Sequence, residues 1–213
     1  MYIFLTGATG FLGTVLLRSL LLKGHTVTAL VRAKHGVGAL DRIKGRLLEY
    51  DPDFQFNKVI GHTLHIAEQS SSKHTFGLDE KSYLKYANIA DMIIHNAACT
   101  ALETDWDLYE KVNNGGTLEA IELATHTRKK SVVYISSAYV AGARTGRVYE
   151  DELVVKGTFR NGYEKSKAIA ENEVRKGAAA GRIRAMILRP SIIIGSSKNG
   201  WMSEEHHFFD FIF

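Results

Sequence analysis

The stretch that decides the fold is "FLTGATGFLG", residues 4–13, in which an apolar run leads into glycines at positions 7, 10 and 13. The apolar run predicts a buried strand, and the apolar periodicity after the glycines predicts a helix. Backbone N–H groups at a helix start lack partners and lie at the positive end of the dipole, so they can hold a phosphate. We therefore expect Gly7 to form the turn, Gly10 to leave room for the phosphates of a dinucleotide, and Gly13 to allow close packing of the helix on the sheet. A glycine turn with a purely structural role is the alternative.

The rest of the chain alternates short apolar runs with longer segments of helical periodicity, which is typical of β-α units that form a parallel sheet. The runs are almost wholly apolar, as in strands covered by helices on both faces. The sequence therefore predicts an α/β protein with a Rossmann-type doubly wound parallel sheet. The expected strands are 2–5, 26–31, 58–61, 91–96, 131–137 and 185–190, and the expected helices are 11–23, 39–50, 80–89, 107–127 and 163–177.

Composition narrows the range of partners and locations. The chain has 213 residues, 45% of them hydrophobic and 23% charged, as expected of one globular domain. The net charge is +4, but Lys and Arg are spread along the chain, so we expect no nucleic-acid partner. The single cysteine, Cys99, and the lack of a signal-peptide pattern or a membrane-spanning run predict a cytoplasmic location. His206 and His207 are adjacent, which is poor spacing for a shared ligand, so we expect no metal site.

The residues after the second expected strand favour NADP(H). Enzymes that use NAD place an acidic residue there to bind the ribose 2′-hydroxyl, whereas a 2′-phosphate requires a cation. No acidic residue occurs from Met1 to Leu40; Arg32 follows the strand and Arg42 lies on the next helix. A guanidinium group can bind phosphate through two parallel hydrogen bonds.

A pair of residues in "YEKSK" predicts proton transfer. Tyr163 and Lys167 are four residues apart and thus one turn from each other on a helix. A nearby ammonium stabilises a phenolate, so we expect Lys167 to lower the pKa of Tyr163. Ser136 and Ser137 end the fifth expected strand, at the sheet edge where ligands of open α/β sheets bind. A serine that orients a carbonyl and a tyrosine that protonates its oxygen indicate carbonyl reduction, or its reverse.

Longer motifs join the glycine turn along the chain. They are "LVRA" followed by Arg42, "IIHNAA", "VNNGGT", "VVYISSAYVAG", "YEKSKAIAE" and "LRPSIIIGSSKNG". Together they resemble the extended short-chain dehydrogenase/reductase superfamily over residues 2–201, and their sequences are similar to its thioester reductase and fatty acyl-CoA reductase branch. The resemblance implies an NADP-dependent oxidoreductase that reduces acyl thioesters, held on coenzyme A or on the phosphopantetheine arm of a carrier protein, to an aldehyde or alcohol.

The same resemblance implies roles for individual residues. The residues lining the pyrophosphate would be Thr9, Gly10, Phe11 and Leu12. The 2′-phosphate would be bound by Arg32 and Arg42. After the fourth strand, the residues beside the cofactor would be Ala97 and Ala98. At the reacting carbonyl, the implied residues are Ser137 as the orienting hydroxyl, Tyr163 as proton donor, Lys167 as the group that tunes Tyr163 and holds the nicotinamide ribose, and Asn113 as support for a relay water.

The chain departs from the family pattern in two places. The family has "GDL" after its third strand, with the Asp on adenine, whereas this chain has "GHTL" at 61–64, which puts His62 at the expected adenine contact. Family members also continue past the sixth strand into a substrate-binding lobe. We therefore expect a cofactor-binding and catalytic domain at 1–195 and the start of a largely absent lobe at 196–213, with an apolar end at 208–213.

The sequence is also compatible with two other functions. A sugar-nucleotide epimerase or dehydratase would use the same Ser, Tyr and Lys, but such enzymes hold NAD and prefer an acidic residue where Arg32 stands. A non-catalytic NADP(H)-binding sensor would suit the missing lobe, but it would not need Ser137, Tyr163 and Lys167.

Overall fold

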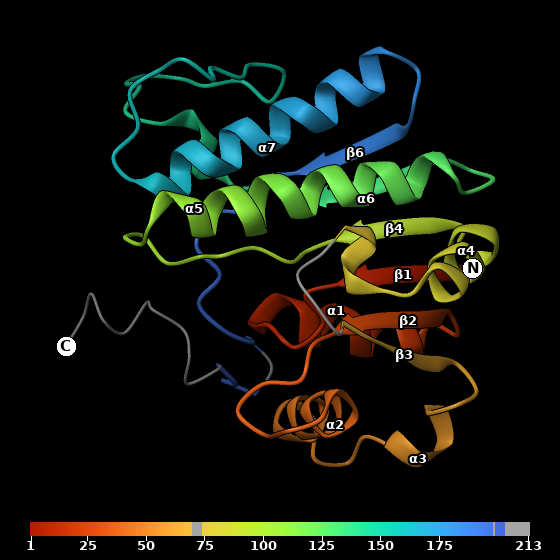
Figure 1. Cartoon of the computed structure of the whole chain (residues 1–213). Coiled ribbons are helices and arrows are strands. Elements are labelled where there is room, and N and C mark those ends of the chain that lie inside the picture. The colour runs from red at the N-terminus through yellow and green to blue at the C-terminus, as the bar shows by residue number, and fades with distance from the viewer. Residues whose placement is uncertain (70–73, 198, 203–213) are drawn as a thin grey trace.

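The computed structural model describes residues 1–69, 74–197 and 199–202. They form a six-stranded sheet in the order β3-β2-β1-β4-β5-β6, with parallel pairing throughout (Figure 1). The sheet grows from β1 to one side through β2 and β3, and then to the other side from β4 onward. This order is that of a doubly wound Rossmann-type sheet, so the predicted fold class is confirmed. The strands are β1 (Tyr2–Thr6), β2 (Thr26–Val31), β3 (Leu64–Glu68), β4 (Met92–His95), β5 (Ser131–Ile135) and β6 (Arg184–Leu188).

Helices connect the strands along the chain. Where the sequence predicts one helix over 107–127, a π-helical turn at Glu110–Gly115 joins two α-helical segments, α5 and α6. Such turns are rare and change the direction of the side chains within a helix. The α-helices are α1 (Phe11–Leu22), α2 (Ala39–Tyr50), α3 (Phe56–Val59), α4 (Glu80–Ile89), α5 (Trp106–Tyr109), α6 (Gly116–Thr125) and α7 (Gly162–Ala179).

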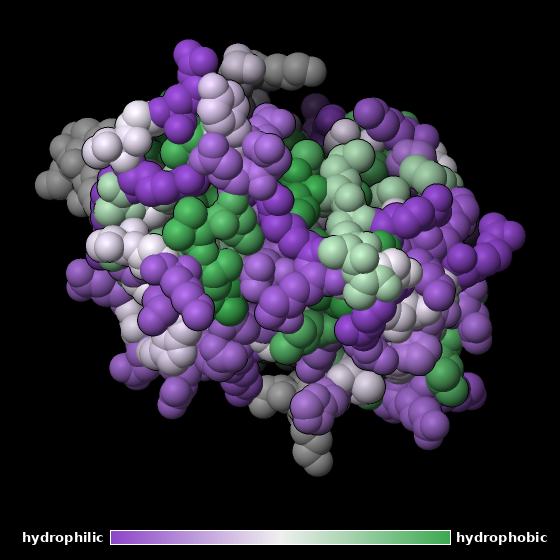
Figure 2. Space-filling model, turned by 90° about the horizontal axis from the view of Figure 1, so that it is seen from above, coloured by the Kyte–Doolittle hydropathy of each residue, from purple (hydrophilic) through white to green (hydrophobic). Residues whose placement is uncertain are grey.

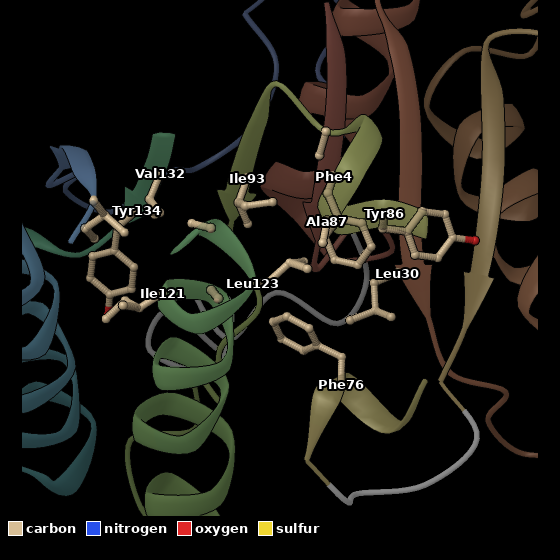
Figure 3. Close-up of a cluster of buried hydrophobic side chains, with 14 of the residues drawn as sticks. Phe4, Leu30, Phe76, Tyr86, Ala87, Ile93, Ile121, Leu123, Val132 and Tyr134 are labelled. Atoms are coloured by element: carbon tan, nitrogen blue, oxygen red, sulfur yellow. The ribbon is translucent and has the colours of Figure 1, made fainter. Parts of the chain in front are cut away.

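Two hydrophobic cores lie on the two faces of the sheet. In β1, Ile3 and Leu5 belong to the core shared with α1 and α2, whereas Phe4 belongs to the core shared with α4, α6 and α7. Figure 3 shows this second core, in which Phe4 and Ile93 from the strands lie near Leu123 from α6. Because both faces are covered, the central strands are buried along nearly their whole length.

The third strand is not where the sequence predicts it. The apolar stretch at 58–61 belongs partly to the short helix α3, and β3 begins at Leu64 instead. Leu64 and Ala67 are buried, while the two residues between them are half-buried. β3 lies at an edge of the sheet, so it carries polar residues such as His65 and lacks the continuous apolar run of a central strand.

The chain after β6 runs back toward α1 (Figure 1). Trp201 stacks on Phe11 with the ring centroids 5.1 Å apart, and it meets the ring of Tyr50 edge-on at 4.8 Å. Asn199 Nδ2 donates to the Tyr50 carbonyl at 3.3 Å. The first residues after the predicted boundary at 195 therefore pack on the start of α1 and the end of α2.

The other edge of the sheet is β6, whose residues are mostly exposed. Met186 and Leu188 have 59% and 45% of their surfaces exposed. On the face seen in Figure 2, hydrophobic residues form separate patches among hydrophilic ones. Within the part of the chain that the structure describes, no helix has both the length and the apolar character needed to cross a membrane. His206, His207 and the predicted apolar end at 208–213 lie outside the described residues.

Candidate cofactor site and active site

Gly7, Gly10 and Gly13 form the turn between β1 and α1. Gly7 has a φ of +71°, a left-handed conformation that favours glycine, and a Cβ there would lie 2.6 Å from the Ala97 nitrogen. A Cβ at Gly13 would lie 1.9 Å from the Gly7 carbonyl oxygen. Both positions therefore require glycine for packing. Gly13 lets α1 pack on the turn itself rather than on the face of the sheet, which differs from the expectation.

The start of α1 has the character of a phosphate-binding site. Gly10 is the N-cap residue, and its neighbourhood is open, because a Cβ there would meet only the Gly7 carbonyl oxygen, at 3.4 Å. The first turn of α1 contains no acidic residue that would repel an anion. The helix dipole and the backbone N–H groups of such a helix start attract phosphate.

Two polar side chains hold the turn against the end of β4. Thr6 Oγ1 accepts hydrogen bonds from the backbone nitrogens of Asn96 and Ala97 at 3.2 and 3.1 Å. Its own proton then goes to His95 Nδ1, 2.9 Å away, which makes His95 the tautomer protonated at Nε2. Asn96 Nδ2 donates to the Gly7 carbonyl at 3.1 Å. These bonds place Ala97 beside the turn, and Ala98 is the next residue along the chain.

His95 lies in the sheet below these contacts and is buried. Its imidazole stacks on the Tyr134 ring, with centroids 5.9 Å apart and an interplanar angle of 17°. Burial, together with the nearby Lys167, lowers the pKa of His95 to about 3. The imidazole is therefore neutral at ordinary pH.

Arg42 connects the glycine turn to the end of β2. Its Nη1 donates to the Arg32 carbonyl at 2.6 Å, and its Nη2 donates to Thr9 Oγ1 at 3.4 Å. The Arg32 residue itself is exposed. Two guanidinium groups thus lie at the end of the second strand, where the 2′ position of an adenosine ribose is bound in this fold.

The predicted serine and tyrosine meet at the carboxyl end of β5. Ser137 is buried at the start of a 3-10 turn, Ala138–Ala141, and its Oγ accepts from the Tyr139 nitrogen at 3.2 Å. Tyr163 lies in the first turn of α7, and its phenol faces the Ser137 side chain. Burial raises the pKa of Tyr163, and the neighbouring Ser137 hydroxyl lowers it by less.

Lys167 lies one turn after Tyr163 and is also buried. Its Nζ donates to the Ile135 carbonyl at 2.7 Å and lies 4.5 Å from the centroid of the Tyr134 ring. Burial lowers the pKa of Lys167 to about 7, while Glu171 acts in the opposite direction. The expectation that Lys167 lowers the pKa of Tyr163 is wrong for this structure, because the ammonium points to Ile135 and Tyr134 and burial dominates at the phenol.

Asn113 lies in the π-helical turn and is buried. Its Oδ1 accepts from the Cys99 nitrogen at 2.7 Å, and its Nδ2 donates to the Cys99 carbonyl at 3.1 Å and to Ser166 Oγ at 2.8 Å. Because Ser166 precedes Lys167, Asn113 ties the loop after β4 to α7. The structure thus brings Asn113 against the helix that carries Tyr163 and Lys167.

His62 is not brought to this site. It precedes β3, and the pairing of Val27 with Leu64 puts it at the amino end of the strands, whereas the glycine turn follows their carboxyl ends. The adenine contact predicted for His62 is therefore wrong, because the strand was expected too early in the chain. Among the described residues, no three His, Cys, Asp or Glu side chains gather as a metal site would require.

Sequence analysis missed three residues that support the site. Thr6 lies within "FLTGATGFLG" and Asn96 within "IIHNAA", but their hydrogen bonds to backbone could not be read from spacing. Glu171 is fully buried one turn after Lys167 and accepts a hydrogen bond from Ser136 Oγ at 2.6 Å. The repeated spacing of four from Tyr163 through Lys167 to Glu171 was the signal that could have identified it.

Comparison with known proteins agrees with this arrangement. The nonribosomal peptide synthetase asaC of Aspergillus flavus is 34% identical over 209 residues, which are 93% of this chain and 20% of that protein. The terminal R domain from the myxalamid PKS-NRPS biosynthetic pathway has a TM-score of 0.83 at 30% identity, covering 96% of this chain and 52% of that one. UDP-glucuronic acid 4-epimerase from Bacillus cereus, in complex with NAD, has a TM-score of 0.69 at 22% identity, over 93% and 58% of the two chains, and shares the fold.

The chain spans about a fifth of asaC and about half of the R-domain chain. The family model for NAD-binding domains of male sterility proteins matches residues 5–213. This match covers the glycine turn, the tyrosine and lysine of α7 and the motifs between them. The chain therefore belongs to the male sterility protein family of NAD-binding domains, in the thioester reductase branch of the extended short-chain dehydrogenases/reductases.

Proposed function

We propose that this chain is the cofactor-binding and catalytic part of an NADPH-dependent reductase of acyl thioesters. The thioester would be held on a carrier protein's phosphopantetheine arm or on coenzyme A, and the product would be an aldehyde or alcohol. The observation that carries the proposal is the meeting of Ser137 and Tyr163, with Lys167 one turn away, at the sheet edge that also holds the glycine turn. The relatives support the substrate class, since one is a nonribosomal peptide synthetase and another is a terminal R domain of such a pathway.

The residues present fit NADP(H). The glycine turn is open at Gly10, where a Cβ would meet only the Gly7 carbonyl oxygen, and the start of α1 suits the pyrophosphate. Arg42, bridging Thr9 and the end of β2, would bind the 2′-phosphate together with Arg32. When bound, the nicotinamide supplies a hydride to the carbonyl carbon.

Residues of the chain would orient and protonate the oxygen of that carbonyl. Ser137 would donate a hydrogen bond to it and orient it. Tyr163 would protonate the oxygen as negative charge develops, and its raised pKa suits this role because it keeps the phenol protonated at neutral pH. Lys167 would hold the nicotinamide ribose. Asn113 would support the return of a proton through water by keeping the loop after β4 and α7 in place.

Oxidation of NADPH, followed by its absorbance, tests the proposal on the chain with an acyl-coenzyme A, an acylated carrier protein and a UDP-sugar. We expect thioester-dependent oxidation that falls about 100-fold or more in Tyr163→Phe, because that variant lacks the donated proton, while NADPH binding stays within about twofold. The matched control is Tyr149→Phe, since Tyr149 is 55% exposed and its variant also loses one phenolic hydroxyl. We expect it to retain full activity.

Two results would overturn the proposal. Turnover of the UDP-sugar but of neither thioester would assign the chain to the epimerase or dehydratase class. Binding of NADPH without turnover of any substrate would favour the sensor.

A further inference from the structure

Glu171 is the most completely paired buried acid of the site. It lies on α7 with no exposed surface, and burial of a carboxylate is costly unless cations or donors satisfy it. Arg189 donates to both of its oxygens, from Nη2 to Oε1 at 2.7 Å and from Nε to Oε2 at 3.0 Å. Arg175 Nε donates to Oε1 at 2.8 Å, and Ser136 Oγ donates to Oε2 at 2.6 Å. These bonds hold the pKa of Glu171 below its usual range despite burial.

This carboxylate joins the elements that carry the proposed catalytic groups. Ser136 directly precedes Ser137 at the end of β5, and Arg189 follows β6. The two arginines also donate to backbone carbonyls of the segment 149–152, Arg189 to Glu152 at 2.7 Å and Arg175 to Glu150 at 2.9 Å. Glu171 thus fixes α7, the ends of two strands and this segment relative to one another.

Glu171 is also the negative charge that acts on Lys167. The two residues are four apart on α7 and are therefore neighbours one turn apart. The groups that face Lys167 from other elements are Tyr134 of β5 and His95 of β4, and neither provides a negative charge at neutral pH. On α7 itself, Tyr163 is a protonated phenol with a raised pKa.

One further acid precedes Lys167 on the same helix. Glu164 Oε2 accepts a hydrogen bond from the backbone nitrogen of Arg160 at 3.0 Å, just before the N-cap residue Asn161. Its Oε1 lies 3.6 Å from Arg160 Nη1. That pairing directs Glu164 to the start of the helix. Glu171 remains the acid whose charge supports an ammonium on Lys167.

We propose that Glu171 is a positioning residue, which holds the Ser136–Ser137 strand end against α7 and supplies negative charge that favours the ammonium form of Lys167 in its buried place. The inference rests on the proposed function, because protonated Lys167 is the form that would bind a ribose hydroxyl there. Its role is indirect, since Glu171 is enclosed by Ser136 and the two arginines and acts through Lys167 and Ser137.

The test compares Glu171→Gln with Arg175→Gln, which removes a charge of the opposite sign from the same cluster. Both variants disturb the cluster's packing, but only the loss of the acid withdraws negative charge from Lys167. The readout is the titration of Lys167 by NMR of protein labelled with carbon-13 at the lysine ε-carbon, with the signal identified by its loss in Lys167→Arg. This measurement needs neither substrate nor cofactor.

We expect the Lys167 midpoint to fall by about one pH unit or more in Glu171→Gln, and not to fall in Arg175→Gln. Should Glu171→Gln fail to fold, Glu171→Asp answers the same question, because its retracted carboxylate lies farther from Lys167 and should lower the midpoint by a smaller amount. An unchanged midpoint in the folded Glu171 variant would overturn the inference. An equal fall in Arg175→Gln would also overturn it, because disturbed packing would then explain both.

The pH dependence of kcat/KM for NADPH-dependent thioester reduction links the titration to chemistry. We expect the alkaline limb to move to lower pH in Glu171→Gln by the same amount as the midpoint. A limb that stays in place while the midpoint moves would overturn the positioning role. If the wild-type chain reduces no thioester, the proposed function fails, while the NMR titration still decides whether Glu171 governs Lys167.

Discussion

Replacement of Gly13 by alanine should harm both stability and cofactor binding, against the usual effect of such a change in a helix. Alanine in place of glycine inside a helix ordinarily stabilises it by about 1 kcal/mol. At Gly13, however, the new Cβ would lie 1.9 Å from the Gly7 carbonyl oxygen and 2.9 Å from Asn96 Nδ2. Ordinary contact begins near 3.4 Å, so α1 must move by about 1.5 Å relative to the turn.

Backbone lies on both sides of this contact, so no side-chain rotation can relieve it. Overpacking of this kind costs about 1–3 kcal/mol, and here we expect the upper end of that range. After the gain in helix propensity, Gly13→Ala should lower the free energy of unfolding by about 2 kcal/mol. The displaced first turn should also weaken NADPH binding by about tenfold or more, because the pyrophosphate is held by fixed backbone groups.

Gly45→Ala is the matched control. Gly45 lies inside α2, and a Cβ there would meet nothing within 4 Å. This variant should be stabilised by about 1 kcal/mol and should bind NADPH normally, so the two variants should differ by about 3 kcal/mol in urea unfolding. The reasoning is refuted if Gly13→Ala unfolds within about 0.5 kcal/mol of wild type and retains its affinity for NADPH.

Three further changes address other contacts. Arg42→Gln should weaken NADPH binding about tenfold and leave NADH binding nearly unchanged in parallel titrations; an equal loss for both would remove the 2′-phosphate role. Thr6→Val should lower the free energy of urea unfolding by about 2 kcal/mol, because the backbone N–H groups of Asn96 and Ala97 lose their acceptor. The control is Thr28→Val, which loses one side-chain bond to Tyr2; a smaller loss in Thr6→Val than in this control would contradict the prediction. Wild type should gain stability relative to Lys167→Met between pH 7 and pH 10, because the unfolded lysine still binds a proton that the folded one, with a pKa of about 7, has released; a flat difference in urea unfolding would exclude the lowered pKa.

The elements with a strong local signal could be predicted from the sequence. The glycine triplet fixed the place of β1 and α1, and the expected bounds of 39–50 and 80–89 coincide with α2 and α4. The third strand could not be predicted in the same way. At the edge of the sheet it is buried only at Leu64 and Ala67, so the more apolar stretch before it, part of which belongs to α3, gave the stronger signal.

The active-site residues show where spacing along the chain stops being informative. Tyr163 and Lys167 lie on the predicted helix, and Ser137 meets Tyr163, because parallel strands bring their carboxyl ends to one edge. The direction of the pKa shift at Tyr163 depends on burial by residues far along the chain, which no local pattern reveals. Likewise, the bond between Glu171 and Arg189 joins α7 to the end of β6, and it follows only once the last strand is placed in the sheet.

The buried state of His95 has a consequence for the pH response of the protein. A histidine usually changes charge near pH 6.5, but this one stays uncharged far below that value because it has no contact with water. The imidazole stacked on Tyr134 therefore stays uncharged near Lys167 and does not act as a proton sensor. A reaction rate that changes with pH near neutrality would thus report the titration of Lys167 on α7, whose pKa is about 7, and not that of the buried His95.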